Sequence, residues 1–449
     1  METYEVKKAG GPVTIQVEVP GSKSITNRSL LMAAMGDGES VLKGVLFSDD
    51  SRYFLRALED LGFQIEVEEK EKTVRIKGQG GNIPEKEAEI YAGSAGTAAR
   101  FLTAFLAMGD GVYRVDASEQ MKKRPMRELL EVLEKLGADI CYQGEEYTFP
   151  MVIEGIGRKR PDRRKESAAV ELNIDRSSQF LSALLMTAPL RFSSLKVRLT
   201  GSRSARSYVE MTEQMMKQFG HPGVRRLEGD CYETLDGVYH AQCYQIEPDV
   251  SAACYFYAMA AVTGGSAVVR HMRRDSLQGD MKFLKVLEQM GCEAAWISDK
   301  ESPYGQDGDG EGGELQLWMK GPQEGKLKGI TASFSDFSDQ ALTMAAIAPY
   351  ADAPVTIQGI AHIRGQESDR ISVICTELGR MGIKCSETQD GITIYPGRPQ
   401  GARIRTYDDH RAAMAFAITG LRTDGIIIEN PSCCKKTFPE YFTVMGQAY

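Results

Sequence analysis

The sequence predicts an α/β fold that repeats one supersecondary unit six times over two domains. Six short helical segments rich in Ala, Leu and Met recur with starts roughly 70 to 86 residues apart, a spacing typical of a supersecondary unit. Strand-like alternation and a second, amphipathic helix follow most of them. The six apolar segments are 30–35, 101–108, 180–190, 255–262, 341–351 and 412–421.

A second helix is expected after each of the first five apolar segments, because Leu and Met recur there at steps of three and four residues. Most of these helices end in an apolar residue followed by glycine, a common C-terminal cap. The first helix of each unit is apolar nearly all round, so we expect it in the interior. The second helices are expected at 52–62, 126–137, 208–220, 281–291 and 372–382.

Strands are expected where apolar and polar residues alternate after the second helices. Examples are 63–69, 73–78, 391–397 and 426–431. A further strand at 13–19 precedes the first unit and has no partner nearby, so we expect it to pair elsewhere. Six units divide naturally into three and three with a break at 245–248, which gives two domains of about 200 residues.

The composition excludes several classes of function. The chain has 449 residues, is 42% hydrophobic and carries a net charge of −8, which argues against a general nucleic-acid or membrane-surface binder. Nine cysteines without a C-x-x-C pair suit a reducing compartment better than a disulfide framework or a zinc site. The first residues lack the apolar region of a signal peptide, and no apolar run is long enough to span a bilayer. We therefore expect a cytoplasmic protein.

The stretch GSKSITNR at 21–28 is the first candidate for a binding site. It places Lys23, Ser24 and Arg28 at the start of a helix, where the helix dipole favours an anion. The glycine-lysine spacing of a P-loop is absent, so nucleotide binding is not the first expectation. Taken alone, the stretch equally fits a capped surface helix. Polar stretches also precede the other buried segments, at 93–100, 175–179, 248–253, 333–340 and 407–413.

If the units are equivalent, these helix starts converge on one anion-attracting cleft between the domains. The cations expected to line it are Lys23, Arg28, Arg100, Arg124, Arg370, Arg411 and Lys436. Carboxylates at Asp339, Glu367 and Asp409, with no metal motif nearby, suit proton transfer. The alternatives are a helix cap for Asp339 and an ion-pair partner of Arg370 for Glu367. No catalytic-triad spacing, zinc-protease motif or dinucleotide fingerprint is present.

Seven motifs in this order resemble the 5-enolpyruvylshikimate-3-phosphate synthase family of enolpyruvyl transferases: GSKSITNR, GSAGTAARFL, KRPM, SSQFLSALLM, ESDR, DDHRAAMAF and KTFPEYF. They extend from about Pro20 to Phe442. The resemblance implies a two-domain inside-out α/β barrel of six βαβαββ repeats, with buried helices and an active site in the interdomain cleft. In the family the N-terminal strand joins the C-terminal half. The implied domains are thus 21–246, mainly for shikimate 3-phosphate, and 1–20 with 247–449, for acid/base and phosphoenolpyruvate groups.

The reaction implied by the resemblance transfers the enolpyruvyl group of phosphoenolpyruvate to the 5-hydroxyl of shikimate 3-phosphate. It releases phosphate and leads to chorismate and the aromatic amino acids. It uses no metal and no organic cofactor. Shikimate 3-phosphate and phosphoenolpyruvate would be the only partners, without nucleic acid or membrane, and we expect a monomer.

The resemblance also implies roles for individual residues. Asp339 would bind shikimate 3-phosphate and take its 5-hydroxyl proton, and Glu367 would protonate the methylene carbon and later remove that proton. Lys23 would touch both substrates, and Gln179 would lie between them. Shikimate 3-phosphate would also be held by Ser24, Arg28, Ser177 and Ser178, and phosphoenolpyruvate by Gly96, Arg124, Arg370, Arg411 and Lys436.

The chain departs from the family pattern at several contact positions. Gln366 replaces the usual lysine before the catalytic glutamate and so removes a cation. His362 stands where asparagine is usual, and Ala205 stands where serine is usual, with Ser204 one place away. We still expect activity. The family is the target of glyphosate, and sensitivity is left open because 95–97 borders that pocket.

Two competing interpretations remain. The related enzyme acting on UDP-N-acetylglucosamine would need a reactive cysteine in a mobile loop between the second and third units, where the chain has only Cys141, at the end of a helix-and-strand pattern. A non-catalytic scaffold would not need so many acid/base and anion-binding groups. Phosphate release with both substrates present would distinguish an enzyme from a scaffold.

Overall fold

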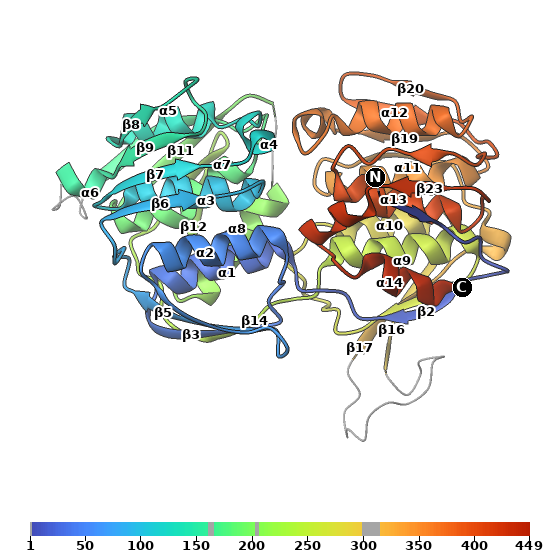
Figure 1. Cartoon of the computed structure of the whole chain (residues 1–449), viewed down its shortest axis with the longest axis horizontal. Helices are drawn as coiled ribbons and strands as arrows, with labels where there is room; N and C mark the ends of the chain where they lie inside the picture. Colours follow the sequence, from blue (N-terminus) through green and yellow to red (C-terminus); the bar gives the residue numbers. More distant parts are fainter. Residues whose placement is uncertain (1, 160–165, 203–205, 299–314) are drawn as a thin grey trace. The chain divides into compact units, whose positions relative to one another are not determined.

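The computed structural model describes residues 2–159, 166–202, 206–298 and 315–449. The chain forms two compact units, one of Lys23–Ile246 and the other of Met1–Ser22 together with Glu247–Tyr449. We call them the N-terminal and the C-terminal unit. In each, helices lie among small sheets, and the N-terminal segment runs into the C-terminal unit (Figure 1). The departures at Ser204 and Ala205 lie outside the described residues.

The described residues form six small sheets, and five of these share one arrangement, a parallel pair of strands followed by two antiparallel strands. The N-terminal unit holds three of the five. Their orders are β14 (Cys243–Gln245), β3 (Asp37–Lys43), β5 (Thr73–Gln79), β4 (Gln64–Glu68); β6 (Glu87–Tyr91), β7 (Val112–Asp116), β9 (Met151–Glu154), β8 (Asp139–Tyr142); and β10 (Ser167–Asn173), β11 (Ser194–Thr200), β13 (Cys231–Thr234), β12 (Val224–Leu227).

The C-terminal unit holds the other two and a smaller sheet of three strands. The four-stranded orders are β2 (Thr14–Val17), β15 (Ser266–Val269), β17 (Leu315–Lys320), β16 (Glu293–Ser298) and β18 (Thr331–Ser333), β19 (Val355–Gln358), β21 (Gly391–Ile394), β20 (Cys385–Glu387). The third sheet is β1 (Thr3–Glu5), β23 (Ile427–Glu429) and β22 (Arg403–Ile404). The strands expected from alternation at 63–69, 73–78, 391–397 and 426–431 are confirmed as β4, β5, β21 and β23.

Strand β2 pairs with a strand far away in sequence. It runs parallel to β15, with Thr14 opposite Ser266 and Val17 opposite Val269. The position beside β3 in the N-terminal unit is occupied instead by β14, which pairs in parallel with it. The expectation that the strand at 13–19 pairs elsewhere is thus confirmed, and its ladder hydrogen bonds hold the start of the chain in the C-terminal unit.

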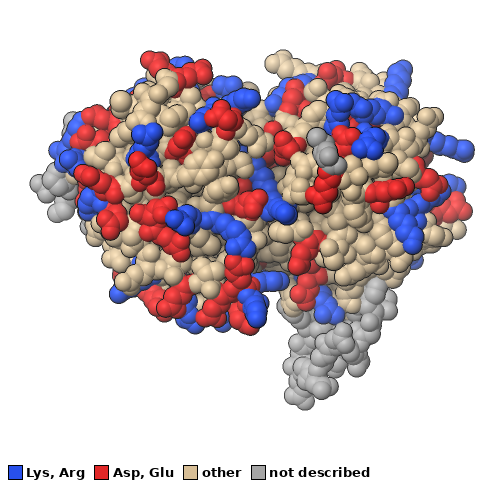
Figure 2. Space-filling view, viewed as in Figure 1, with Lys and Arg blue, Asp and Glu red and all other residues tan. Residues whose placement is uncertain are grey.

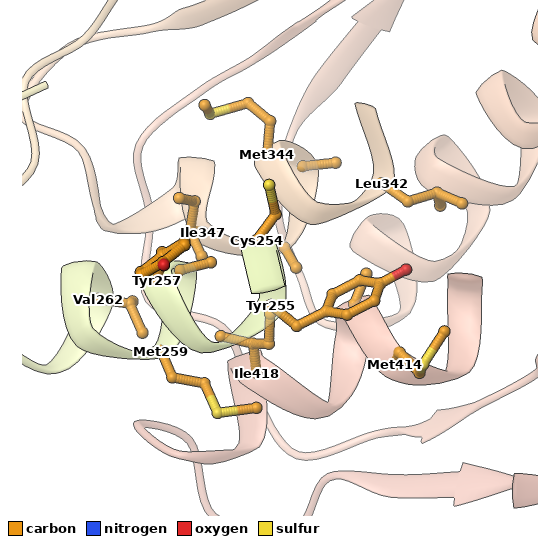
Figure 3. Packing of buried hydrophobic residues seen from close by; sticks show 14 of the residues in the cluster. Cys254, Tyr255, Tyr257, Met259, Val262, Leu342, Met344, Ile347, Met414 and Ile418 are labelled. Carbon is orange, nitrogen blue, oxygen red and sulfur yellow. The ribbon is translucent and has the colours of Figure 1, made fainter. Parts of the chain in front are cut away.

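Three buried helices lie in each unit. They are α1 (Lys23–Met35), α3 (Gly96–Met108) and α7 (Gln179–Thr187), and then α9 (Val250–Thr263), α11 (Ala341–Ile347) and α13 (His410–Gly420). Every residue of α3, α9 and α13 is buried, which confirms the interior position predicted from their all-round apolar character. Figure 3 shows side chains of α9, α11 and α13 packed against one another, among them Tyr257, Leu342 and Ile418.

The second, amphipathic helices form where the spacing of Leu and Met predicted them. They are α2 (Asp49–Asp60), α5 (Arg127–Leu136), α8 (Arg206–Gln218), α10 (Met281–Gln289) and α12 (Arg370–Arg380). Each buries one apolar face, and burial of one large aliphatic side chain contributes about 1.5–3 kcal/mol. In α5 the cap residue is Gly137, whose φ of 110° is a left-handed conformation that suits glycine.

The buried helices begin earlier than their apolar segments. Helix α1 starts at Lys23, α3 at Gly96 and α13 at His410, so most of the polar stretches form the first turns of these helices. The prediction that the polar residues precede the helices is wrong in this respect. Their side chains lie among other polar groups at the helix start, and burial against such partners extends the helix beyond its apolar run.

Charges of both signs are interspersed over the surface seen in Figure 2. Among the described residues, no helix combines the length and the apolar character that crossing a membrane requires. In the same part of the chain, no three His, Cys, Asp or Glu side chains come together as a set that could hold a metal ion.

Candidate active site

Arg370, the first residue of α12, lies at the centre of a carboxylate cluster in the C-terminal unit. Its Nε is 2.8 Å from Oδ2 of Asp409, its Nη1 is 2.9 Å from Oδ1 of Asp339, and its Nη2 is 3.0 Å from Oε2 of Glu367. All three guanidinium nitrogens therefore donate to carboxylates, and the side chain is 2% exposed. Charge-assisted bonds of this kind fix both partners in one geometry.

The charge of Arg370 is secured by its partners. Burial alone would lower the pKa of the guanidinium, but Asp409, Glu367 and Asp339 together raise it well above the usual value. Arg370 therefore stays cationic at any working pH. A buried arginine surrounded in this way is a fixed positive charge that holds three carboxylates within reach of one another.

Two further cations complete this cluster. Arg411 Nη2 lies 2.7 Å from Oδ2 of Asp339, and Lys436 Nζ lies 3.4 Å from Oε1 of Glu367. Asp339 is thus held between two arginines, and Glu367 between an arginine and a lysine. The geometry brings together all the C-terminal residues that the sequence analysis selected, and three cations balance three carboxylates.

Short local structures place these groups. Asp409 caps α13, where its Oδ1 accepts from the backbone N–H of Arg411 at 3.0 Å. Asp339 belongs to the short 3₁₀ turn η5 (Ser338–Gln340) before α11. The helix-cap alternative for Asp339 is wrong, since Gln340 occupies the cap position of α11. The ion-pair alternative for Glu367 is confirmed, because Glu367 does pair with Arg370.

The sequence analysis missed Asp280, a buried carboxyl group beside this cluster. It stands at the cap position of α10 but makes no cap hydrogen bond, and its Oδ1 accepts from Ser251 Oγ at 2.9 Å and from Gln340 Nε2 at 2.7 Å. Burial, and then the nearby charge of Asp339, raise its pKa to about 6. A capping residue before a helix gives no sequence signal for such a role.

The two departures from the family pattern in this unit have defined partners. The amide oxygen of Gln366 accepts a hydrogen bond from Nη1 of Arg370. His362 Nε2 lies 2.7 Å from Oγ of Ser338, the neighbour of Asp339. Gln366 therefore accepts a hydrogen bond from Arg370, whereas a lysine at this position would add a second positive charge.

Arg28 on α1 is a buried cation of the N-terminal unit, and its hydrogen-bond partners are neutral. Nε donates to Thr212 Oγ1 at 2.9 Å, Nη2 to Ser182 Oγ at 3.1 Å and Nη1 to the carbonyl of Ser24 at 3.0 Å. The guanidinium also lies over the ring of Phe101, 5.2 Å from its centroid. Burial lowers the pKa of Arg28 to about 10, so the group remains charged at neutral pH.

Gln179, the first residue of α7, links the starts of two buried helices. Its Oε1 accepts from Arg100 Nη1 at 2.6 Å, and its Nε2 donates to Thr97 Oγ1 at 3.0 Å. Arg100 in turn donates to the carbonyl of Pro125, one residue from Arg124. Both ends of the Gln179 amide are therefore fixed, and the starts of α3 and α7 lie side by side, as the repeat predicted.

Gly96, the first residue of α3, lies directly against the guanidinium of Arg124. A Cβ atom added at Gly96 would stand 2.5 Å from Nη1 and 2.7 Å from Cζ of that arginine. Only glycine allows this close approach. Gly96 and Arg124, both expected to contact phosphoenolpyruvate, are therefore neighbours.

The remaining candidates of the N-terminal unit also lie at helix starts. Lys23 Nζ is 3.7 Å from Oδ2 of the buried Asp50. Ser177 Oγ accepts from the backbone N–H of Gln179 at 3.3 Å. Ser178 occupies the cap position of α7, where its side chain makes no cap hydrogen bond, and Ser24 follows Lys23 in the first turn of α1.

Three residues that contact these candidates were not predicted from the sequence: Asp50, Ser182 and Thr212. In the sequence they look like ordinary residues of a cap region and of helix faces.

Comparison with known proteins identifies the family of this chain. The model of the EPSP synthase (3-phosphoshikimate 1-carboxyvinyltransferase) family matches residues 7–445. The chain belongs to the EPSP synthase family. The 3-phosphoshikimate 1-carboxyvinyltransferase of Trichormus variabilis is 42% identical over 99% of this chain and 98% of its own length. The chloroplastic protein of that name from Arabidopsis thaliana is 36% identical over 96% of this chain and 81% of its own.

A solved structure supports the same assignment. The EPSP synthase of Acinetobacter baumannii superposes with a TM-score of 0.78 and 27% identity, covering 100% of this chain and 98% of the other. The position of Cys141 agrees as well. Cys141 lies within strand β8, opposite Val152 of β9, and not in a loop.

Proposed function

We propose that this chain transfers the enolpyruvyl group of phosphoenolpyruvate to the 5-hydroxyl of shikimate 3-phosphate, with release of phosphate. The observation that carries the proposal is the cluster in which Asp339 and Glu367 share Arg370 and each contacts a further cation. Two carboxylates held among three cations supply a base and an acid next to binding groups for an anionic substrate.

In the proposed addition step, Asp339 accepts the proton of the 5-hydroxyl. At the same time, the oxygen of that hydroxyl forms a bond to C2 of phosphoenolpyruvate. Glu367 gives a proton to the methylene carbon C3, so the product of this step is a tetrahedral adduct. In the elimination step, the bond between C2 and the phosphate oxygen breaks and Glu367 takes a proton back from C3. The double bond forms again, and phosphate leaves with the proton that Asp339 took from the 5-hydroxyl.

The cations have a matching role in this proposal. Phosphoenolpyruvate is held by Arg370, Arg411 and Lys436, together with Gly96 and Arg124 of the N-terminal unit. Shikimate 3-phosphate is held by Ser24, Arg28, Ser177 and Ser178, with Asp339 at its 5-hydroxyl. Lys23 contacts both substrates, and Gln179 lies between them. Charge-assisted hydrogen bonds to phosphate and carboxylate are among the strongest that a protein offers, which suits two polyanionic substrates.

We also propose the finer architecture of the family for this chain, an inside-out barrel of six βαβαββ repeats whose active site lies between two domains. The domains are 21–246, for shikimate 3-phosphate, and 1–20 with 247–449, for the acid/base groups and phosphoenolpyruvate. The recurrent sheet order and the buried helices support this view. We place the reaction in the cytoplasm, since all nine cysteines are free thiols.

Phosphate release measured with purified protein tests the proposed function. Turnover is expected only when shikimate 3-phosphate and phosphoenolpyruvate are both present, and each substrate alone is the control. A parallel reaction with UDP-N-acetylglucosamine in place of shikimate 3-phosphate is expected to release no phosphate. Tight binding of both substrates without phosphate release would support a scaffold and overturn the proposal.

A further inference from the structure

Two cysteines on neighbouring elements of the C-terminal unit stand outside the reaction site. Cys375 lies in the middle of α12, and Cys385 is the first residue of β20. Helix α12 packs against β20 after the turn that joins them. The Sγ atom of Cys385 lies 3.8 Å from the backbone oxygen of Cys375, to which its thiol donates a hydrogen bond.

Both thiols are accessible without being fully exposed. Each is partly buried against the hydrophobic core of the unit. Cys433 and Cys434 also contact each other, but they are adjacent in sequence and Cys434 is buried. Of these two pairs, only Cys375 and Cys385 can join separate elements of the fold.

The surroundings favour Cys385 as the attacking thiol. The hydrogen bond from Cys375 lowers the pKa of Cys385, whereas the same bond and burial raise the pKa of Cys375. Among the charged side chains nearby, Glu387 opposes thiolate formation at both cysteines and Arg364 assists it at Cys375. Arg364 and Glu387 also pair with each other at 3.0 Å, so their opposing charges largely offset one another.

We propose that Cys375 and Cys385 are a site of reversible disulfide formation that cross-links α12 to β20. The oxidant is a small-molecule disulfide such as oxidised glutathione. The Cys385 thiolate attacks one sulfur of that disulfide, which forms a mixed disulfide and releases one thiol. The Cys375 sulfur then attacks Sγ of Cys385 and releases the second thiol, so two cysteines are oxidised and one small disulfide is reduced to two thiols.

The cross-link acts on the helix that carries Arg370. Arg370 begins α12, and Cys375 lies little more than one turn farther along the same helix. Because the Cys385 thiol already contacts the backbone of Cys375, we expect the bond to require little movement and the turnover at ambient temperature to change less than about twofold. The oxidised protein should resist thermal unfolding better, since the cross-link restricts the unfolded chain.

Peptide mapping of the full-length protein tests this site. Native protein is incubated with oxidised glutathione, free thiols are alkylated, and digestion is followed by mass spectrometry without reductant. We expect a peptide pair joined through Cys375 and Cys385 that separates on adding dithiothreitol, with Cys433 and Cys434 alkylated. Quantitative alkylation of both Cys375 and Cys385 would overturn the proposal, and so would stable glutathione on either thiol of the wild type.

Two variants assign the order of attack. Cys375→Ser should retain glutathione as a mixed disulfide on Cys385, because the resolving thiol is missing. Cys385→Ser should leave Cys375 largely unmodified, and Cys433→Ser is the matched control that should form the cross-link as the wild type does. Oxidation of the wild type is expected to raise its thermal midpoint, reversibly with dithiothreitol. A lower midpoint after oxidation would overturn the stabilising role.

Discussion

Arg28 and Arg370 are both nearly fully buried arginines in the first two turns of a helix, yet their surroundings are opposite. Arg370 donates to three carboxylates, which raise its pKa. Arg28 donates to two hydroxyls and a carbonyl, none of the described carboxylates contacts it, and burial lowers its pKa to about 10.

The difference indicates two ways of using a buried cation. At Arg370 the charge is already paired with carboxylates, and the guanidinium holds Asp339 and Glu367 in the positions that the proposed proton transfers require. The guanidinium of Arg28 donates hydrogen bonds, but none of the described carboxylates neutralises its charge. Its positive charge can therefore attract an anion. The C-terminal unit is thus suited to acid/base chemistry and the N-terminal unit to binding a phosphate ester.

The largest expected effect is on turnover, from Glu367→Gln. The glutamine still accepts from Arg370 but cannot donate or take a proton at the substrate carbon, so kcat should fall by about 10²–10⁴-fold. Substrate dissociation constants, measured by calorimetry, should change little. Glu387→Gln, which alters an exposed partner of Arg364, is the control and should keep the wild-type rate. A Glu367→Gln rate close to wild type would remove Glu367 from the mechanism.

Asp280→Asn should change the pH dependence of stability. The pKa of Asp280 in the folded protein is raised from 3.8 to about 6, so the folded state binds the proton more tightly than the unfolded state does. Its contribution to stability is therefore present below pH 4 and is lost as pH rises to 6. Asparagine does not titrate, so the stability of the variant relative to wild type should rise by up to about 3 kcal/mol across this range.

Urea unfolding at several pH values between 4.5 and 7.5 measures this shift. The matched control is Asp424→Asn, which alters a carboxylate that is 79% exposed and should show no such trend. A constant difference between Asp280→Asn and wild type across the range would show that Asp280 is ionised throughout. The C-terminal unit would then hold a second fully charged carboxylate beside Arg411, in addition to Asp339.

Arg28→Met should weaken shikimate 3-phosphate binding by about 10- to 100-fold, because it removes the un-neutralised charge of the N-terminal unit. Arg28→Lys separates charge from geometry, since lysine keeps the charge but cannot reach Thr212 and Ser182 with one planar group. Calorimetric titration with shikimate 3-phosphate alone measures both. Unchanged affinity of Arg28→Met for shikimate 3-phosphate would show that the charge of Arg28 does not contribute to binding this substrate.

Gly96→Ala should weaken phosphoenolpyruvate binding by about tenfold, because the new Cβ would stand 2.5 Å from Nη1 of Arg124 and displace the guanidinium. Binding of shikimate 3-phosphate should be retained. Gly144→Ala is the matched control, since a Cβ there meets nothing within 4 Å. Equal effects of the two substitutions on KM for phosphoenolpyruvate would mean that Arg124 moves freely.

The smallest effect is expected from Lys8→Met, which breaks the exposed ion pair with Asp424. Its N–O distance is 3.0 Å, but the side chains are 47% and 79% exposed, so solvent screens the interaction. The free energy of unfolding should fall by less than about 0.5 kcal/mol at moderate salt. A decrease in the free energy of unfolding as large as that expected for a buried ion pair would show that exposure does not predict how much an ion pair stabilises this protein.

Helices and most strands could be predicted because their signals are local. Leucine spacing placed α5 and α12 to within a few residues, and alternation placed β4 and β21. The partner of β2 could not be predicted from its own residues, since any edge with a free ladder of backbone groups satisfies the same hydrogen bonds. The earlier starts of α1 and α3 also depend on polar partners that lie far away in sequence.

The sequence alone determined the order of the elements and the set of chemical groups at the helix starts, including Asp339, Glu367, Arg370 and Lys23. The tertiary structure decided which of these groups lie close enough to form ion pairs. Asp339 and Arg370 lie 31 residues apart in the chain, and Arg370 and Asp409 lie 39 apart. Periodicity reports only neighbours within a few residues, whereas Coulomb energy depends on distance in space. For that reason Asp280 reads as a helix cap in the sequence and becomes a buried, titratable neighbour of the cluster only in the folded protein.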